Sequence, residues 1–232
     1  MRTKYKYAQP KTKAIWLWLP PLMGALAAIV LLVGIVASIY DWHTNTITKK
    51  HAAVAIAQAN KGVSNGTPAT TPISVNTFAN YRVAPNLPRY IFIPKLKVKA
   101  IVLSLSTTSS NQLQAPPNIY ETGWYKNSSL PGKAGAMLID GHVSSWTSHG
   151  IFYGLKTLVA GDTIQVERGD GAILTYRVVT SQTYSSTNVD MTAALSPINP
   201  HKPGLNLITC TGKVIAGTSE FNERIIVFAE QV

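Results

Sequence analysis

Cys210 is the only cysteine among the 232 residues, so the chain offers one thiol for chemistry. The residues before it, 205–209, alternate leucines with the polar Asn206, a pattern that predicts a half-buried strand. Thr211 and Gly212 follow and predict a turn. A thiol at the end of a strand can be rigidly held and still exposed, as a nucleophile requires. The alternative is that Cys210 is a small buried apolar residue without chemistry.

A cysteine nucleophile usually needs a histidine to exchange protons with it. Two of the five histidines lie in the folded part at positions that a sheet could present. His142 follows an apolar run and a glycine, as a side chain at a sheet edge does, whereas His149 lies in a loop rich in serine, threonine and glycine. Position favours His142 over His149. The five histidines are His43, His51, His142, His149 and His201.

An arginine begins the last predicted strand. Alternation places Arg224 on the same face as Ile226 and Phe228, where a charge has to be paired or used. A guanidinium suits the stabilisation of an oxyanion or the orientation of a peptide backbone. The alternative is an arginine at a strand end whose charged group reaches water.

Short strands would position the side chains of Cys210, His142 and Arg224. The folded domain that contains them is predicted to span residues 87–232. Asp170 and Gly171 form a strong hairpin turn signal. One short helix is predicted over residues 151–158. Many short strands with turn signals and almost no long helix indicate an all-β barrel or sandwich. The strands are predicted at residues 90–94, 98–105, 136–139, 162–167, 174–178, 205–209 and 224–229.

The chain before this domain predicts a membrane anchor. Residues 1–13 carry five basic residues and no acidic one, and form a cytoplasmic segment under the positive-inside rule. Residues 14–42 are long and apolar enough for a transmembrane signal anchor, and residues 43–86 read as an extracellular spacer. A cleaved signal peptide is the alternative, but its apolar region is usually shorter.

The net charge of +11 argues less for nucleic acid than it first suggests. Residues 1–85 hold nine basic residues and one acidic residue, which leaves twelve basic and nine acidic residues for 86–232. A nucleic-acid footprint needs a basic face on the folded domain, so no nucleic-acid partner is expected. A single cysteine excludes Cys-x-x-Cys metal spacing, and the acidic residues are scattered, so neither a cofactor nor a structural calcium ion is expected.

Three motifs resemble those of the sortases, which are membrane-anchored cysteine transpeptidases of Gram-positive-type cell surfaces. The stretch 206–210 matches the motif Thr-Leu-x-Thr-Cys except that Asn206 replaces the first threonine. His142 follows a strand and a glycine, and Arg224 opens the strand after the cysteine. The likeness runs from about residue 89 to the C-terminus and is greatest to classes E and F. Further similar stretches are 91–94, 123–125, 131–132, 152–155 and 161–162.

The resemblance implies a closed sortase-like β-barrel with one or two short helices, preceded by a single transmembrane helix. It implies that Cys210 attacks the Thr–Gly bond of a Leu-Pro-x-Thr-Gly-like sorting signal and forms a thioacyl intermediate. His142 would act as general acid and base, Arg224 would hold the oxyanion or the substrate backbone, and Thr209 would support the site.

The resemblance also implies partners and a location. An amine from a peptidoglycan precursor or a pilin lysine would resolve the intermediate and so anchor surface proteins that carry C-terminal sorting signals. The enzyme would sit in the cell membrane through residues 14–42, single-pass, with a cytoplasmic N-terminus and an extracellular catalytic domain. The alternatives are a membrane-anchored β-domain that binds a peptide or surface ligand without catalysis, and a cysteine hydrolase that uses water.

Overall fold

The computed structural model of the chain describes residues 33–36, 67–107 and 113–232. The predicted cytoplasmic segment 1–13, most of the predicted membrane segment 14–42 and the spacer up to residue 66 lie outside the described residues. Residues 33–36 are helical. Within the described ranges, no helix combines the length and the apolar character needed to cross a bilayer.

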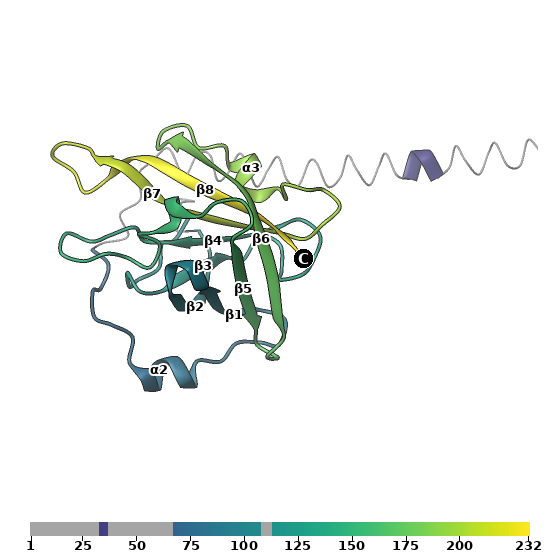
Figure 1. Cartoon of the computed structure of the whole chain (residues 1–232), viewed down its shortest axis with the longest axis horizontal. Helices are drawn as coiled ribbons and strands as arrows, with labels where there is room; N and C mark the ends of the chain where they lie inside the picture. Colours follow the sequence, from purple (N-terminus) through teal and green to yellow (C-terminus); the bar gives the residue numbers. More distant parts are fainter. Residues whose placement is uncertain (1–32, 37–66, 108–112) are drawn as a thin grey trace, which may run out of the picture. The chain divides into compact units, whose positions relative to one another are not determined.

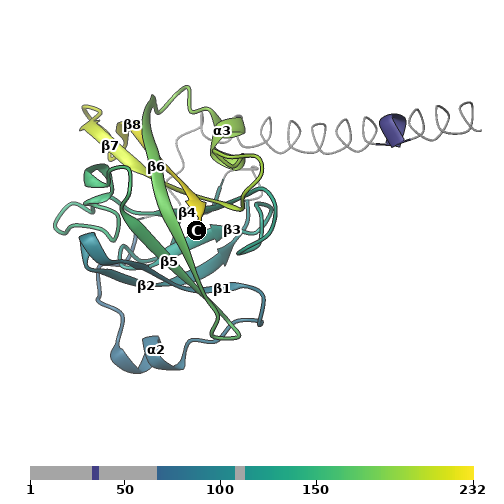
Figure 2. The same cartoon turned by 45° about the vertical axis from the view of Figure 1, so that its right-hand side comes forward.

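Eight strands close into one barrel, so the predicted all-β barrel is confirmed (Figures 1 and 2). The strand order is β1-β2-β3-β4-β7-β8-β6-β5. The pairs β2/β3 and β4/β7 are parallel and all others are antiparallel. The strands are β1 (Pro88–Ile93), β2 (Val98–Leu105), β3 (Thr122–Tyr125), β4 (Ala136–Gly141), β5 (Thr163–Arg168), β6 (Ile173–Ser185), β7 (Gly204–Val214) and β8 (Phe221–Gln231).

Short helices decorate the barrel. They are the α-helices α2 (Val75–Asn80) and α3 (Met191–Leu195) and the 3₁₀ helices η1 (Pro94–Leu96) and η2 (Leu155–Thr157). Within the short helix predicted over residues 151–158, the structure has the 3₁₀ helix η2, which is shorter than predicted. The buried side chains of this stretch, Phe152, Leu155 and Leu158, recur every three residues. That spacing fits the three residues per turn of a 3₁₀ helix.

Strands β4, β7 and β8 bury both of their faces. Inside the barrel, Met137, Leu207 and Val227 belong to the main core. Their neighbours in the chain, among them Ile208 and Ile226, point to the opposite face and pack in a second apolar cluster with α3. The predicted half-buried alternation of β7 is thus wrong, because its other face lies under α3 and Asn206 has no exposed surface.

The predicted turn at Thr211 and Gly212 is wrong as well, because β7 continues to Val214. The pairing of β7 with β8 shifts register between Thr211 and Val214. Gly212 lies inside this irregularity with a φ of +84°, a conformation that glycine adopts at little cost. The glycine therefore kinks the strand instead of ending it.

Residues 67–86 fall in the predicted spacer and contact the barrel domain. Ala69 pairs with the segment after β2: its N–H donates to the Pro117 carbonyl at 2.8 Å, and the Ile119 N–H donates to the Ala69 carbonyl at 3.0 Å. Further along, Phe78 of α2 stacks on Tyr90 of β1 with ring centroids 4.5 Å apart. This stretch therefore packs along the barrel before β1 begins.

Candidate active site

Three adjacent strands bring the predicted site residues together. In the parallel pair β4/β7, Asp140 lies opposite Ile208, and His142 directly follows the end of β4. In the antiparallel pair β7/β8, Cys210 lies opposite Arg224, and both residues lie inside their strands. Because neighbouring strands are about 4.8 Å apart, the three adjacent strands bring His142, Cys210 and Arg224 together as a row.

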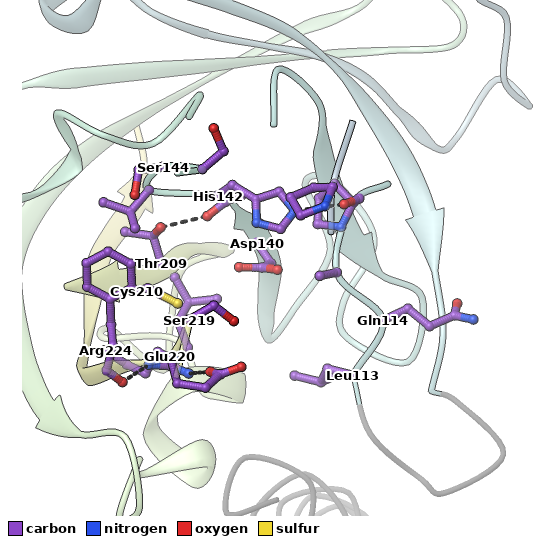
Figure 3. A pocket seen from close by; sticks show the side chains of 18 of the residues that line it. Leu113, Gln114, Asp140, His142, Ser144, Thr209, Cys210, Ser219, Glu220 and Arg224 are labelled. Atoms are coloured by element: carbon purple, nitrogen blue, oxygen red, sulfur yellow. Dashed lines mark hydrogen bonds and ion pairs between the residues drawn. The ribbon is translucent and has the colours of Figure 1, made fainter. Parts of the chain in front are cut away.

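This row opens into a pocket of about 820 Å³ (Figure 3). Cys210, His142 and Arg224 all line it. The other walls come from the segment after β2, the loop after β4, the β6–β7 connection and the β7–β8 loop. In these walls lie residues 67–68, 105, 113–117, 140–141, 143–146, 189, 191, 208–209, 214 and 219–221.

The ring of His142 is held by a backbone carbonyl. Its Nε2 lies 2.7 Å from the Pro116 carbonyl oxygen, which can only accept, so Nε2 carries the hydrogen and donates it. This leaves Nδ1 to exchange protons with a reacting group. His149, the alternative histidine, instead stacks on Tyr153 with ring centroids 3.5 Å apart. Of the two histidines that the sequence left open, His142 is therefore the one that lines the pocket with Cys210.

The Cys210 thiol is partly exposed at the pocket and strongly shielded from water. Burial raises the pKa of Cys210 to about 11; the guanidinium of Arg224 lowers it, and the carboxylates of Asp140 and Glu220 raise it. The resting sulfur is therefore protonated near neutral pH, so attack on a carbonyl requires that a base take the thiol proton.

The side chain of Arg224 is fixed on the other flank of Cys210. Its Nη1 donates to the carbonyls of Phe221 at 2.9 Å and Glu223 at 3.0 Å. Its Nη2 lies 3.5 Å from the Glu220 carboxylate. The guanidinium is therefore held by contacts within the protein and does not extend freely into water, which was the alternative interpretation of Arg224.

The sequence model of the Sortase domain matches residues 91–232, well over half of the chain. The chain belongs to the sortase family. Sortases are cysteine transpeptidases, which agrees with a pocket built around a single cysteine. A comparison with curated protein sequences finds no match.

Solved sortase C structures share the fold. Sortase C-1 from Streptococcus pneumoniae is 20% identical over 81% of this chain and 90% of its own, with a TM-score of 0.50. The pilus-related sortase C of Group B Streptococcus is 16% identical over 81% and 86%, with a TM-score of 0.50. Sortase C-1 from Actinomyces oris is 22% identical over 81% and 98%, with a TM-score of 0.49. At such low identity the likeness shows the fold alone.

Thr209 ties the two strands of this sortase that carry the cysteine and the histidine. Its side chain is buried, and its hydroxyl donates to the Gly141 carbonyl at 2.6 Å. Thr209 directly precedes Cys210, and Gly141 directly precedes His142. One hydrogen bond therefore fixes the spacing between β7 beside Cys210 and the end of β4 before His142.

Asn206, the departure from the sortase motif, has a structural role that the sequence did not reveal. Its side-chain amide donates to the carbonyls of Ala194 at 2.8 Å and Ser196 at 2.9 Å, with a longer contact to Ala193 at 3.4 Å. These carbonyls close the C-terminal end of α3, which carries the pocket residue Met191. Asn206 therefore holds the pocket wall against β7.

Asp140 lines the pocket beside the histidine and was missed from the sequence. Strand alternation places it on the same face as His142, two residues before it, which is the signal that could have revealed it. Burial raises the pKa of Asp140, against the lowering effects of His142, the Gly141 N–H and Arg224. Across the described ranges, no three His, Cys, Asp or Glu side chains gather as a metal site.

Proposed function

We propose that this sortase cleaves a Leu-Pro-x-Thr-Gly-like sorting signal through a thioacyl-enzyme intermediate and transfers the acyl group to an amine. The observation that carries the proposal is the row of His142, Cys210 and Arg224 on three adjacent strands at one pocket. A thiol, an imidazole and a guanidinium can supply the nucleophile, the proton exchange and the oxyanion contact that acyl transfer by a cysteine uses.

In the first half of the reaction, the Cys210 sulfur attacks the scissile carbonyl while its proton passes to Nδ1 of His142. The carbonyl oxygen gains negative charge, which the guanidinium of Arg224 stabilises. The tetrahedral intermediate then collapses: the C–N bond breaks, and the imidazolium gives its proton to the leaving amine. Thr209 keeps the sulfur and the imidazole at a fixed separation through its bond to the Gly141 carbonyl.

In the second half, an amine attacks the thioacyl carbonyl with His142 as the base, and the C–S bond breaks. The acceptor is a peptidoglycan precursor or a pilin lysine. Sortase C of Streptococcus pneumoniae has pilin substrates, which supports including the second kind of acceptor. The sorting-signal proteins are then anchored to the cell surface.

The proposed location follows from the N-terminal sequence. Residues 14–42 form a single-pass membrane anchor, with the basic residues 1–13 in the cytoplasm and the domain 87–232 outside the cell. This orientation is supported by the charge before the apolar segment, where five residues are basic and none is acidic.

The test uses the full-length protein in detergent micelles with a Leu-Pro-x-Thr-Gly peptide library and triglycine as the amine. Intact mass spectrometry follows the protein and its products, with Cys210→Ala as the control. An acyl adduct on the protein and a ligated peptide, both lost in the variant, are the expected result. Hydrolysis alone, still dependent on Cys210, would favour a hydrolase. Neither product from folded protein would favour a binding domain with an inert cysteine.

A further inference from the structure

Asp140 places a carboxylate in the pocket that Cys210 and His142 also line. It lies near the end of β4, two residues before His142. Figure 3 shows its carboxylate below the His142 ring. In the proposed attack on the sorting signal, Asp140 forms and breaks no bond.

The charges of the pocket are unlike those of the domain around it. Residues 86–232 carry twelve basic and nine acidic residues, but the charged side chains in the described lining of the pocket are Asp140, Glu220 and Arg224. Arg224 is paired with Glu220 and with two carbonyls, and His142 gives its Nε2 hydrogen to the Pro116 carbonyl. The Gly141 N–H, His142 and Arg224 act on the Asp140 carboxylate, but among the described residues it takes part in none of the salt bridges. It can therefore accept a cationic group from a substrate.

We propose that the Asp140 carboxylate binds the protonated amino group of the acyl acceptor and holds it beside His142. The proposal rests on the proposed function, since it specifies how the same site receives its second substrate. Primary amines are mostly protonated at neutral pH, with pKa values of about 10.4 for a lysine and about 8 for an α-amino group. An acceptor therefore arrives as a cation and needs an anionic contact before it can lose a proton.

The chemical step balances with the groups present. The bound ammonium passes one proton to Nδ1 of His142, and the freed lone pair attacks the thioacyl carbonyl. The C–N bond forms and the C–S bond breaks. The Cys210 sulfur takes a proton back from His142, and the second proton of the new amide nitrogen leaves to solvent. Asp140 contributes binding and exchanges no proton in this step.

A different role for Asp140 would be to orient or charge the His142 ring. That role and the proposed one predict different results with an uncharged nucleophile. If Asp140 acts through His142, its loss slows transfer to every nucleophile, and it also slows the first acylation. If Asp140 binds the ammonium, its loss raises the KM only for nucleophiles that arrive as cations.

The experiment compares Asp140→Asn with the wild type in the full-length protein at a fixed, saturating concentration of sorting-signal peptide. The nucleophiles are triglycine or Nα-acetyl-lysine amide, whichever the wild type accepts, and hydroxylamine, which is mainly uncharged at neutral pH. The expected result is a KM for the cationic amine raised about tenfold to a hundredfold, the effect of losing one charge-assisted contact. The KM for hydroxylamine should stay the same, and the acylation rate should not fall, since the loss of the Asp140 charge lowers the pKa of Cys210.

Asp170→Asn is the matched control, because it makes the same change in the β5–β6 turn, where Asp170 pairs with Arg168. This variant should leave the KM for the cationic amine, the KM for hydroxylamine and the acylation rate unchanged. Circular dichroism checks that both variants fold.

Several outcomes would overturn the proposal. Equal KM values for the cationic amine in Asp140→Asn and the wild type would do so. Parallel losses with both nucleophiles would assign Asp140 to the positioning of His142 instead. If the wild type gives no product that depends on Cys210, the proposed function itself fails. This result differs from that of an active enzyme whose KM for the cationic amine does not change in Asp140→Asn.

Discussion

The pKa of Cys210 predicts how slowly its thiol reacts. Burial raises this pKa to about 11. An ordinary cysteine has a pKa of about 8.5, so at pH 7.5 about 10% of it is thiolate, against about 0.03% at a pKa of 11. Because only the thiolate is alkylated, Cys210 should react with iodoacetamide about 300-fold more slowly than an unperturbed thiol.

The assay follows alkylation by intact mass in the full-length protein. Cys210 is the only cysteine, so each mass shift reports this site alone. Between pH 7 and pH 10 the rate should rise about tenfold per pH unit without a plateau, since the pKa lies above this range. The same protein unfolded in guanidinium chloride should level off near the ordinary pKa. A folded rate that levels off at or below pH 9 would refute the argument from burial.

The neighbours of Cys210 predict the sign of further changes. Arg224 lowers the pKa of Cys210, whereas Asp140 and Glu220 raise it. Arg224→Gln should therefore slow alkylation at pH 8, and Asp140→Asn should accelerate it. Glu220→Gln should also accelerate it, because this change removes a negative charge and frees the guanidinium of Arg224. Faster alkylation of folded Arg224→Gln would show that accessibility, and not charge, controls the thiol.

Three other predictions concern stability. Thr209→Val leaves the Gly141 carbonyl without its 2.6 Å donor. It should lower the free energy of unfolding, measured in urea, by about 1–3 kcal/mol. The control Thr163→Val, at an exposed position, should change this free energy little. Asn206→Leu removes the donors that close α3 and should lower Tm by several degrees in a thermal melt, with Asn206→Thr, the motif residue, milder. Burial raises the pKa of Asp140, so the folded state binds the proton of this carboxyl group more tightly than the unfolded state does. The stability of the fold should therefore fall as pH rises through the range in which the carboxyl group ionises. Asp140→Asn should raise Tm at pH 7 but not at pH 3.

Most strands could be predicted from the sequence because their apolar residues are bounded by clear turn residues. Strand β3 could not, since all four of its residues, Thr122–Tyr125, are buried and show no alternation. The length of β7 was missed because Gly212 normally ends a strand, and here it lies in a register shift. The short helix predicted over 151–158 is confined to the 3₁₀ helix η2, and its exact bounds could not be predicted from a brief apolar repeat.

The residues of the site could be named from motifs, but their arrangement could not. The placement of Cys210 opposite Arg224 depends on a pairing between strands that no local pattern encodes. The carbonyl that holds His142 comes from Pro116, 26 positions away. The roles of the three residues and of Thr209 stay predictions, which the ligation experiment tests.

The contact of residues 67–71 with the barrel has a mechanical consequence. Ala69 shares two hydrogen bonds with the segment 117–119, and the Asn118 amide donates to the Thr71 carbonyl at 2.8 Å. The adjoining Pro116 carbonyl is the acceptor for His142. A force applied to the chain before Thr67 therefore acts first on these three hydrogen bonds. They lie next to the backbone that orients His142, so such a force reaches the active site before it reaches the barrel strands.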